Sequence, residues 1–337
     1  MPTSQPPRAL FAMNPVHLPE LFPPRLMRRL QSSADVDAAL VVRDFGDPAI
    51  AGALAEAELL LTGWGCPRID AAVLHRAPRL RVVLHAGGSV RGWLDDAVWE
   101  RGLAVSSAVQ ANALPVAEYA LAAILFAGKD AFGLRERFRV EQVRPPAGAL
   151  AGVGNLGRRV GIIGASRVGR RVLELLAPFE FEVALYDPYI DGATATALGA
   201  VPLPLDQLLA TSDIVSLHAP DTPETYRMLD QRRLALMPDG AVFINTARGA
   251  LVDPDALTTE LISGRISAIL DVTEPEPLPA RSPLYELPNV FLTPHLAGSL
   301  GNELERLGRA VVDEVERLAA GEPLLHAVHH AQLANSA

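Results

Sequence analysis

Short runs rich in Val, Ile and Leu alternate along the first part of the chain with segments whose apolar residues recur at helical spacing. Runs of four to six such residues predict buried strands, and strands that alternate with helices are typical of a parallel sheet. The strands predicted in this part of the chain are 8–13, 38–43, 58–62, 80–85 and 103–107.

A polar, proline-rich stretch at 141–148 interrupts this pattern, and a second, stronger series of strands and helices begins near residue 159. Six strands with helices between them match a doubly wound nucleotide-binding sheet. The apolar spacing of residues 300–320 predicts a long helix after the last strand. The strands predicted in the second series are 160–163, 182–186, 213–217, 241–245, 267–270 and 290–292.

Length and composition agree with two globular domains. The chain has 337 residues, of which 49% are hydrophobic, enough to bury sizeable cores and to exclude disorder. Its net charge of −9 disfavours nucleic acid and anionic membranes as partners. The longest apolar run, 119–128, is shorter than the ~20 residues that span a bilayer. The lone Cys66 excludes an intrachain disulfide and a Cys-rich zinc site, so we expect a cytoplasmic protein.

The first strand of the second series leads into a glycine motif that suits a dinucleotide. Gly164 permits a tight turn, Gly169 permits close packing of helix and strand, and the helix N-terminus offers N–H groups to a pyrophosphate. Ser166 stands where the motif normally has its middle glycine, and its N–H and hydroxyl remain available to phosphate. Asp187 lies 18 residues beyond Gly169, where a carboxylate accepts ribose hydroxyls and repels a 2′-phosphate. The motif therefore predicts NAD rather than NADP.

Three charged side chains follow the carboxyl ends of the last three predicted strands. They are Arg248, Glu276 and His295, and in a parallel sheet these ends line the ligand crevice. Arg248 could hold a substrate carboxylate bidentately. His295 could exchange a proton with a hydroxyl or carbonyl oxygen, and Glu276 would fix the tautomer of the imidazole. This set suits the oxidation of a hydroxy acid.

These residues lie in segments that resemble the D-isomer-specific 2-hydroxyacid dehydrogenases over nearly the whole chain. The resemblance implies a Rossmann NAD-binding domain, residues 117–301, inserted into a flavodoxin-like substrate-binding domain, residues 1–116 and 302–337. It also implies a homodimer. The segments that carry it are VGIIG at 160–164, DIVSLHAP at 213–220 with TPET at 222–225, INTARG at 244–249, LDV at 270–272 with EPL at 276–278, and TPH at 293–295.

The resemblance also implies which residues contact the cofactor and the substrate. The catalytic residues would be Arg248, Glu276 and His295, and backbone N–H groups of Gly87, Gly88 and Ser89 would bind the substrate carboxylate. Val90 stands where the family often carries an Asp two residues beyond Gly88, and Arg91 follows it, so an extra cation could favour a substrate with a second acidic group. The cofactor would be contacted by Gly164, Ser166, Arg167, Val168, Gly169, Asp187, His218, Pro220, Thr225, Thr246, Ala247, Arg248, Asp271, His295 and Gly298.

The activity that follows is hydride transfer between NAD(H) and a small D-2-hydroxy acid or 2-keto acid. No metal is expected, and the histidines of the tail, residues 324–337, are expected to be solvated. Two alternatives stay open. One is an NAD-sensing regulatory protein of the same fold, and the other is a dehydrogenase of another small oxyanion such as phosphite.

Overall fold

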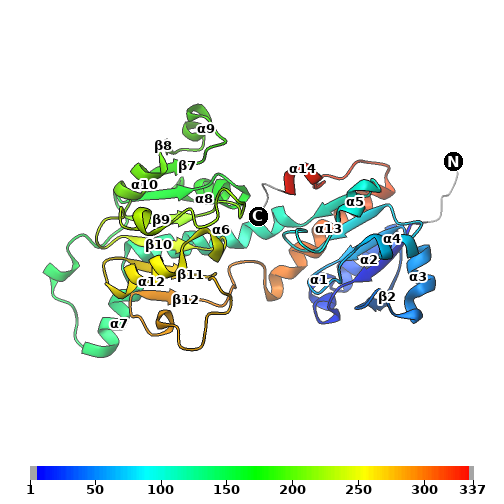
Figure 1. The fold of residues 1–337 in the computed structure, drawn as a ribbon, viewed down its shortest axis with the longest axis horizontal. Coiled ribbons are helices and arrows are strands. Elements are labelled where there is room, and N and C mark those ends of the chain that lie inside the picture. Colours follow the sequence, from blue (N-terminus) through cyan, green and yellow to red (C-terminus); the bar gives the residue numbers. More distant parts are fainter. Residues whose placement is uncertain (1–5, 334–337) are drawn as a thin grey trace. The chain divides into compact units, whose positions relative to one another are not determined.

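The computed structural model describes residues 6–333, which form two compact units (Figure 1). The first unit contains residues 6–113 and 299–333, and the second contains residues 114–298. Residues 1–5 and 334–337, at the two ends of the expected substrate-binding domain, lie outside the described residues. The second unit is therefore one continuous stretch of chain, whereas the first is assembled from two.

The first unit is built on a five-stranded parallel sheet with the order β2-β1-β3-β4-β5. This is the strand order of flavodoxin-like domains, and it confirms the fold predicted for this part of the chain. The strands are β1 (Arg8–Ala12), β2 (Asp35–Val42), β3 (Leu59–Thr62), β4 (Val82–His85) and β5 (Ala104–Ser107). The helices are α1 (Leu18–Leu21), α2 (Pro24–Ser33), α3 (Ala51–Glu56), α4 (Ala71–Arg76), α5 (Asp96–Glu100), α13 (Leu304–Ala319) and α14 (His330–Leu333), with short 3-10 turns η1 (Pro15–His17), η2 (Pro48–Ile50) and η6 (Gly301–Glu303).

The second unit holds a parallel sheet of seven strands, with the order β12-β11-β10-β9-β6-β7-β8. Six strands were predicted here, and the count was wrong because β8 (Val201–Pro202) has only two residues and no detectable period. The order from β8 to β11 is that of a Rossmann sheet, which confirms the predicted class. The other strands are β6 (Arg159–Ile163), β7 (Glu182–Tyr186), β9 (Ile214–Leu217), β10 (Val242–Asn245), β11 (Ser267–Leu270) and β12 (Val290–Leu292).

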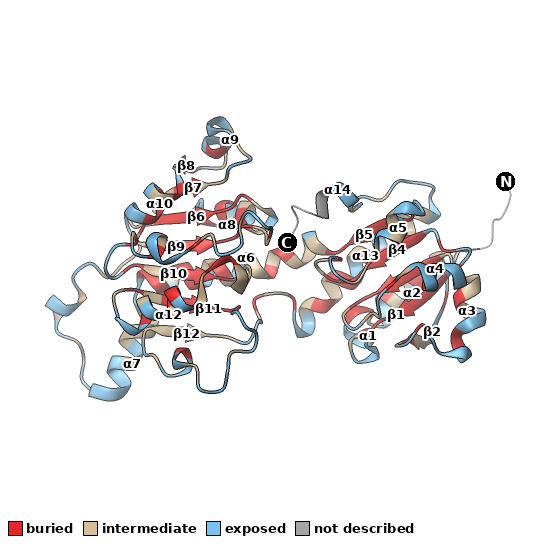
Figure 2. Cartoon of the chain, in the orientation of Figure 1, coloured by how far each residue is buried: buried red, intermediate tan, exposed pale blue. Residues whose placement is uncertain are grey.

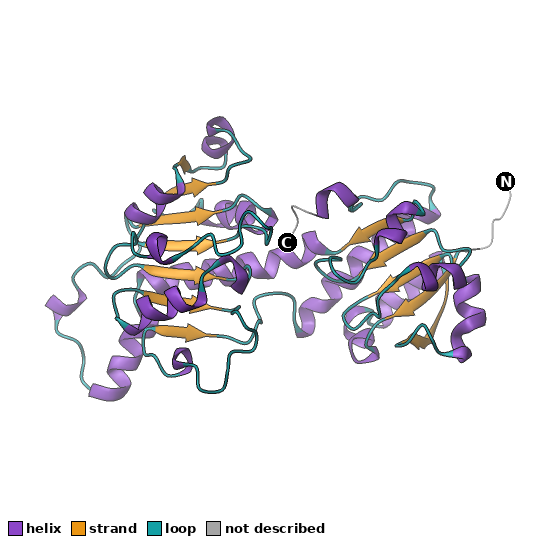
Figure 3. Cartoon of the chain, in the orientation of Figure 1, coloured by secondary structure: helices purple, strands orange, loops and turns teal. Residues whose placement is uncertain are grey.

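Helices pack on both faces of this sheet (Figure 3). They are α6 (Val109–Gly128), which begins in the first unit, α7 (Ala131–Glu141), α8 (Arg167–Leu176), α9 (Gly192–Ala197), α10 (Leu205–Thr211), α11 (Gln231–Leu234) and α12 (Pro254–Ile262), with 3-10 turns η3 (Ala147–Leu150), η4 (Gly249–Leu251) and η5 (Pro283–Tyr285).

The inner strands of each sheet are buried on both faces and are drawn mostly red in Figure 2, whereas β12 is half-buried and β8 is exposed. Along β3, Leu59 and Leu61 belong to one hydrophobic cluster and Leu60 to another, because successive side chains point to opposite faces. All four residues of β3 are buried, as they are in β4 and β9. The short unbroken apolar runs of the sequence reflect this two-sided burial.

The helix α6 is both long and apolar. It has 20 residues and a mean hydropathy of 1.4, so by length and composition it could cross a membrane, contrary to the expectation from the run 119–128. The difference arises because the helix continues through polar positions that interrupt the apolar run. Ala117, Ala120, Ala123 and Ile124 of α6 lie in a core cluster of the second unit, as in a core helix of a globular domain.

The end of the chain is held to the first unit by a buried carboxylate. Glu314 of α13, 2% exposed, accepts hydrogen bonds from Ser106 Oγ and from the backbone N–H groups of Leu325 and His326. Further on, His330 lies 3.2 Å from an Asp96 oxygen and stacks on Trp99. The side chain of His330 stays 57% exposed, in keeping with the expectation that this histidine is solvated.

Candidate active site

The carboxyl ends of β10, β11 and β12 lie side by side at one edge of the second sheet. In the ladder Ile244 pairs with Ile269, which pairs with Phe291, so the three strands end in register. Asp271 and Thr293 directly follow β11 and β12, and Arg248 lies three residues beyond β10. The sheet therefore brings distant parts of the sequence to one edge.

Glu276 and His295 are in direct contact. His295 Nδ1 lies 2.6 Å from Glu276 Oε1, and both side chains are about half exposed, at 50% and 43%. A carboxylate only accepts hydrogen bonds, so Nδ1 carries the proton and Nε2 is the nitrogen left for proton exchange with a substrate. The pairing predicted from the sequence is present in the structure.

The turn that carries His295 is hydrogen-bonded to the carboxylate of Asp271. The side chain of Asp271 is 2% exposed and accepts hydrogen bonds from Thr293 Oγ1, Leu296 N and Ala297 N at 2.6 to 2.9 Å. The carbonyl oxygen of Asp271 also accepts from His295 N. His295 has a φ of 53°, in the left-handed region that non-glycine residues seldom adopt. Asp271 therefore stabilises the backbone that directs the imidazole.

Arg248 lies in a short loop that packs on the loop leading to Glu276. Asn245, at the end of β10, shapes this loop because its amide donates to Arg248 O and its side-chain oxygen accepts from Ala247 N. A Cβ at Gly249 would overlap the backbone carbonyl of Thr273. The Arg248 side chain donates to Ala247 O at 2.6 Å and is partly exposed. The structure thus places Arg248 at the same sheet edge as the Glu276–His295 pair.

The glycine motif after β6 has the geometry of a phosphate turn. Gly164 has a φ of 98°, and a Cβ there would lie 2.7 Å from Ala219 N and Cα. A Cβ at Gly169 would overlap Gly164 O. Ser166 is the N-cap of α8, and its hydroxyl oxygen accepts from Gly169 N at 3.3 Å. The N–H groups of Ser166, Arg167 and Val168 precede the first intrahelical bond and suit a pyrophosphate.

Asp187 lies at the end of β7, next to this turn. One carboxylate oxygen accepts from Ala165 N at 2.7 Å and the other accepts from Tyr189 N at 2.8 Å. Each oxygen keeps a second lone pair for a ribose hydroxyl. The carboxylate is therefore held in place by the backbone of the turn itself, which fits recognition of NAD.

The loops after β9 and β10 supply polar atoms whose burial also fits a cofactor. Thr246 Oγ1 is buried and makes no hydrogen bond to the described residues, and the same is true of His218 Nδ1. His218 Nε2 contacts Ser216 Oγ at 2.8 Å, and burial lowers the pKa of His218 to about 4, so its imidazole is neutral. The orphaned Thr246 hydroxyl is the stronger sign of a bound group.

Thr225 and Gly298, which are also predicted to contact the cofactor, lie in loops that follow β9 and β12. The Thr225 hydroxyl donates to Pro220 O at 2.6 Å, so its proton is used within its own loop. Gly298 follows the His295 turn and ends the second unit. Cofactor contacts by these residues stay predictions.

The glycine loop of the first unit follows β4. A Cβ at Gly87 would overlap His85 Nε2, and Trp93 Nε1 donates to Ser89 O at 3.4 Å, so the buried His85 ring and the partly buried Trp93 ring shape the loop. Burial lowers the pKa of His85 to about 3. The N–H groups of Gly87, Gly88 and Ser89 make no hydrogen bond to another described residue, and they are available to an anion.

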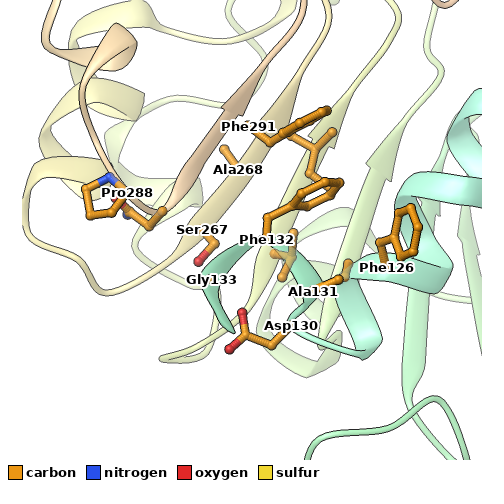
Figure 4. Close-up of a pocket in the computed structure, with 13 residues that line it drawn as sticks. Phe126, Asp130, Ala131, Phe132, Gly133, Ser267, Ala268, Pro288 and Phe291 are labelled. Atoms are coloured by element: carbon orange, nitrogen blue, oxygen red, sulfur yellow. The ribbon is translucent and has the colours of Figure 1, made fainter. Parts of the chain in front are cut away.

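A pocket at the amino ends of the strands of the second sheet lacks the charged side chains of the candidate active site. Figure 4 shows Phe126, Phe132 and Phe291 around it, with Ser267 at the start of β11 and Asp130 as its charged residue. Phe132 stacks on Phe291 with 4.0 Å between ring centroids. The pocket lies where the strands begin, away from the carboxyl edge. Among the described residues no cluster of His, Cys, Asp or Glu could hold a metal ion.

Sequence reasoning missed two residues of this site. Thr293 was noted only as part of a motif, and Tyr119 of α6, whose hydroxyl lies 2.8 Å from Thr293 Oγ1, was not singled out. Residue 119 falls in an apolar helical run, which gives no signal of a polar contact 174 positions away.

Comparison with known proteins gives one family for the second unit. The family model described as "D-isomer specific 2-hydroxyacid dehydrogenase, NAD binding domain" matches residues 121–297. This range includes the phosphate turn, Asp187 and the Arg248, Glu276 and His295 loops.

Individual relatives extend the similarity beyond this range. A D-3-phosphoglycerate dehydrogenase of Mycobacterium bovis is 37% identical over 278 residues, which cover 82% of this chain and 52% of that protein. A glyoxylate/hydroxypyruvate reductase B of Yersinia enterocolitica is 32% identical, with 87% of this chain and 90% of that protein covered. A crystal structure of a protein from Thermus thermophilus superimposes with a TM-score of 0.75 at 30% identity, covering 96% of this chain and all of that one. The chain spans about half the length of the phosphoglycerate dehydrogenases that it matches.

Proposed function

Because the chain belongs to the D-isomer specific 2-hydroxyacid dehydrogenases, we propose that it transfers a hydride between NAD(H) and a small D-2-hydroxy acid or 2-keto acid. The observation that carries the proposal is the contact of 2.6 Å between His295 Nδ1 and Glu276 Oε1 at the carboxyl edge of a dinucleotide-binding sheet. NAD supplies the hydride acceptor or donor when it is bound.

His295 is the proton-transfer group of this proposal. Its Nε2 takes the proton of the substrate hydroxyl during oxidation and returns a proton to the carbonyl oxygen during reduction. Glu276 keeps the imidazole in the tautomer with Nδ1 protonated and stabilises the imidazolium form that reduction needs, as a carboxylate orients histidine in other acid/base pairs.

Two groups are proposed to bind the substrate carboxylate. The planar guanidinium of Arg248 offers paired N–H donors that match a carboxylate. In the first unit, the backbone N–H groups of Gly87, Gly88 and Ser89 are also suited to a carboxylate. Arg248 also balances charge at the reacting end of the substrate, because the carboxylate lies next to the carbon that reacts.

A panel of 2-keto acids tests the proposal directly. The purified chain is mixed with NADH and, in turn, with glyoxylate, hydroxypyruvate, pyruvate and 2-ketoglutarate, and the absorbance of NADH is followed. D-3-phosphoglycerate with NAD is added because of the mycobacterial relative. We expect turnover of at least one acid, abolished by Arg248→Gln. Tight NADH binding with no turnover of any acid would instead favour a regulatory protein or a dehydrogenase of another oxyanion.

The substrate range is proposed to include acids with a second anionic group. Arg91 is exposed in the loop after Gly87 to Ser89, and its backbone N–H donates to Ser89 Oγ at 3.2 Å. In Arg91→Ala we expect a loss of kcat/KM for dicarboxylate or phosphorylated acids that exceeds the loss for glyoxylate. Equal losses for both kinds of acid would remove this role.

A second copy of the chain is proposed as partner, in the cytoplasm. All residues of α7 are described and none is buried, yet Phe138 and Val140 of α7 and the following Val143 are apolar and 57 to 71% exposed. Exposed apolar side chains of this kind suit a dimer interface. We expect Phe138→Glu to convert a dimer into a monomer in analytical ultracentrifugation. A wild-type chain that sediments as a monomer at micromolar concentration would contradict this.

A further inference from the structure

A chain of hydrogen bonds leads from α6 to the turn that carries His295. Tyr119 Oη lies 2.8 Å from Thr293 Oγ1, and Thr293 Oγ1 lies 2.6 Å from Asp271 Oδ1. The threonine hydroxyl has one proton, and a carboxylate surrounded by donors only accepts. Thr293 therefore donates to Asp271, and Tyr119 donates to Thr293.

This chain ends on the group that shapes the turn. Asp271 accepts from the N–H groups of Leu296 and Ala297, which flank His295 on its carboxyl side, while Thr293 lies on its amino side. His295 itself adopts a φ of 53°, a conformation that costs free energy and needs support from its surroundings. The residues on both sides of His295 are thus hydrogen-bonded to one buried carboxylate, that of Asp271. Tyr119 fixes the orientation of the Thr293 hydroxyl, which makes one of the three hydrogen bonds to this carboxylate.

The Tyr119 hydroxyl is a polar group on a helix whose buried face is otherwise apolar. Its neighbours on the buried face of α6, Ala120, Ala123 and Ile124, are apolar and pack in the core. Burial raises the pKa of Tyr119 above its usual value, and the charge of Asp271 adds to the effect, so the phenol keeps its proton throughout the neutral range. The hydroxyl is therefore a permanent donor toward Thr293.

We propose that Tyr119 is a positioning residue for the acid/base histidine, acting through Thr293 and Asp271. The proposal rests on the proposed function, in which His295 moves the proton. Loss of the phenol proton donor leaves Thr293 Oγ1 free to rotate, loosens the turn and lets the imidazole drift from Glu276. A phenylalanine at the same position fills the same space in the core but donates no hydrogen bond.

Four variants test the relay: Tyr119→Phe, Thr293→Val, the two combined, and Thr293→Ser. We expect Tyr119→Phe to lower kcat about fivefold, the worth of one ordinary hydrogen bond, with the KM for NADH within twofold of wild type. Ser212→Ala is the matched control, since it deletes another buried hydroxyl of the same unit, bonded to Leu208 O, far along the chain from the turn.

The double variant and the serine variant separate positioning from packing. If Tyr119 acts through Thr293, the double variant is no slower than Thr293→Val alone, and Thr293→Ser, which keeps the hydroxyl, retains wild-type kcat. Additive losses in the double variant, or an unchanged kcat in Tyr119→Phe, would overturn the proposal.

Hydrogen exchange of the turn gives a readout that does not need turnover. The backbone amides of Thr293, His295, Leu296 and Ala297 should exchange faster in Tyr119→Phe than in wild type and Ser212→Ala. Unchanged exchange in an active enzyme refutes the relay alone. Faster exchange in a chain that reduces no keto acid supports the relay as the support of the turn, and it is then the proposed function that fails.

Discussion

The orientation of the His295 side chain is set by hydrogen bonds that involve other residues. Its φ of 53° is stabilised by the contacts of the turn with Asp271, and its ring is fixed by Glu276. The residue types at 248, 276 and 295 could be interpreted from the sequence, because their chemistry is local to each side chain. The role of Asp271 in the turn could not, since it depends on hydrogen bonds to Thr293, Leu296 and Ala297 that form only when β11 and β12 are adjacent.

Replacement of His295 by alanine should remove turnover and spare the cofactor. Loss of the proton-transfer group is expected to lower kcat by a factor of about 10² to 10⁴, whereas the Kd for NADH changes little because the phosphate turn is untouched. Stopped-flow turnover and fluorescence titration with NADH measure the two effects. Near-normal rates in the variant would show that another group moves the proton.

Replacement of Asp187 by alanine should act on the other end of the cofactor. The variant loses the acceptor of the ribose hydroxyls and also frees Ala165 N and Tyr189 N. We expect the KM for NADH to rise about tenfold or more and the preference over NADPH to shrink, because the repulsion of a 2′-phosphate is gone. Steady-state kinetics with both cofactors provide the measurement, and an unaltered preference would contradict the role of Asp187.

At the scale of elements, the loops after the strands carry the chemistry and the strands set their spacing. Strands with several buried residues, such as β3 and β9, could be predicted because two-sided burial leaves an unbroken apolar run. The strand β8 could not, because two exposed residues ending in Pro202 show no pattern. Tyr119 was missed for a related reason, since an apolar helix hides one polar contact among its buried neighbours.

The close approach of two loops at Gly249 leads to a prediction. A methyl group at this position would overlap the carbonyl of Thr273 and push the Arg248 loop away from the loop that carries Glu276. Gly249→Ala should therefore lower kcat/KM for keto acids about tenfold or more, mostly through KM, with the fold intact by circular dichroism. Gly192→Ala is the control, because a Cβ there meets only Pro202 Cγ at 3.7 Å. Equal kinetics in both variants would show that the loop contact is unimportant.

Across the whole molecule, two buried histidines make stability depend on pH. Burial lowers the pKa of His85 to about 3 and that of His218 to about 4, from an ordinary value of 6.5. Above pH 6.5 both states of the chain keep these rings neutral. As the pH falls below 6.5 the unfolded chain binds protons that the folded chain excludes, so the free energy of unfolding decreases until the folded-state pKa is reached.

For His218 the loss amounts to about 2 kcal/mol between pH 7 and pH 5. Urea unfolding at both pH values, compared with that of His218→Gln, isolates this contribution. The variant should show a smaller decrease over the same interval, whatever its stability at pH 7. An equal decrease in variant and wild type would mean that the imidazole is accessible to protons in the folded state.

The division of the chain into a continuous unit and a split one has a consequence for its synthesis. The apolar residues of α13, such as Leu307, Val311 and Val312, cover one face of the sheet that residues 8–107 form. On the ribosome that sheet emerges early but lacks this cover until residues beyond 299 have been made, whereas the dinucleotide-binding segment can complete its own core before then. Residues 6–113 are thus made before the second unit but complete their core after it, and until then one apolar face of their sheet is accessible to chaperones.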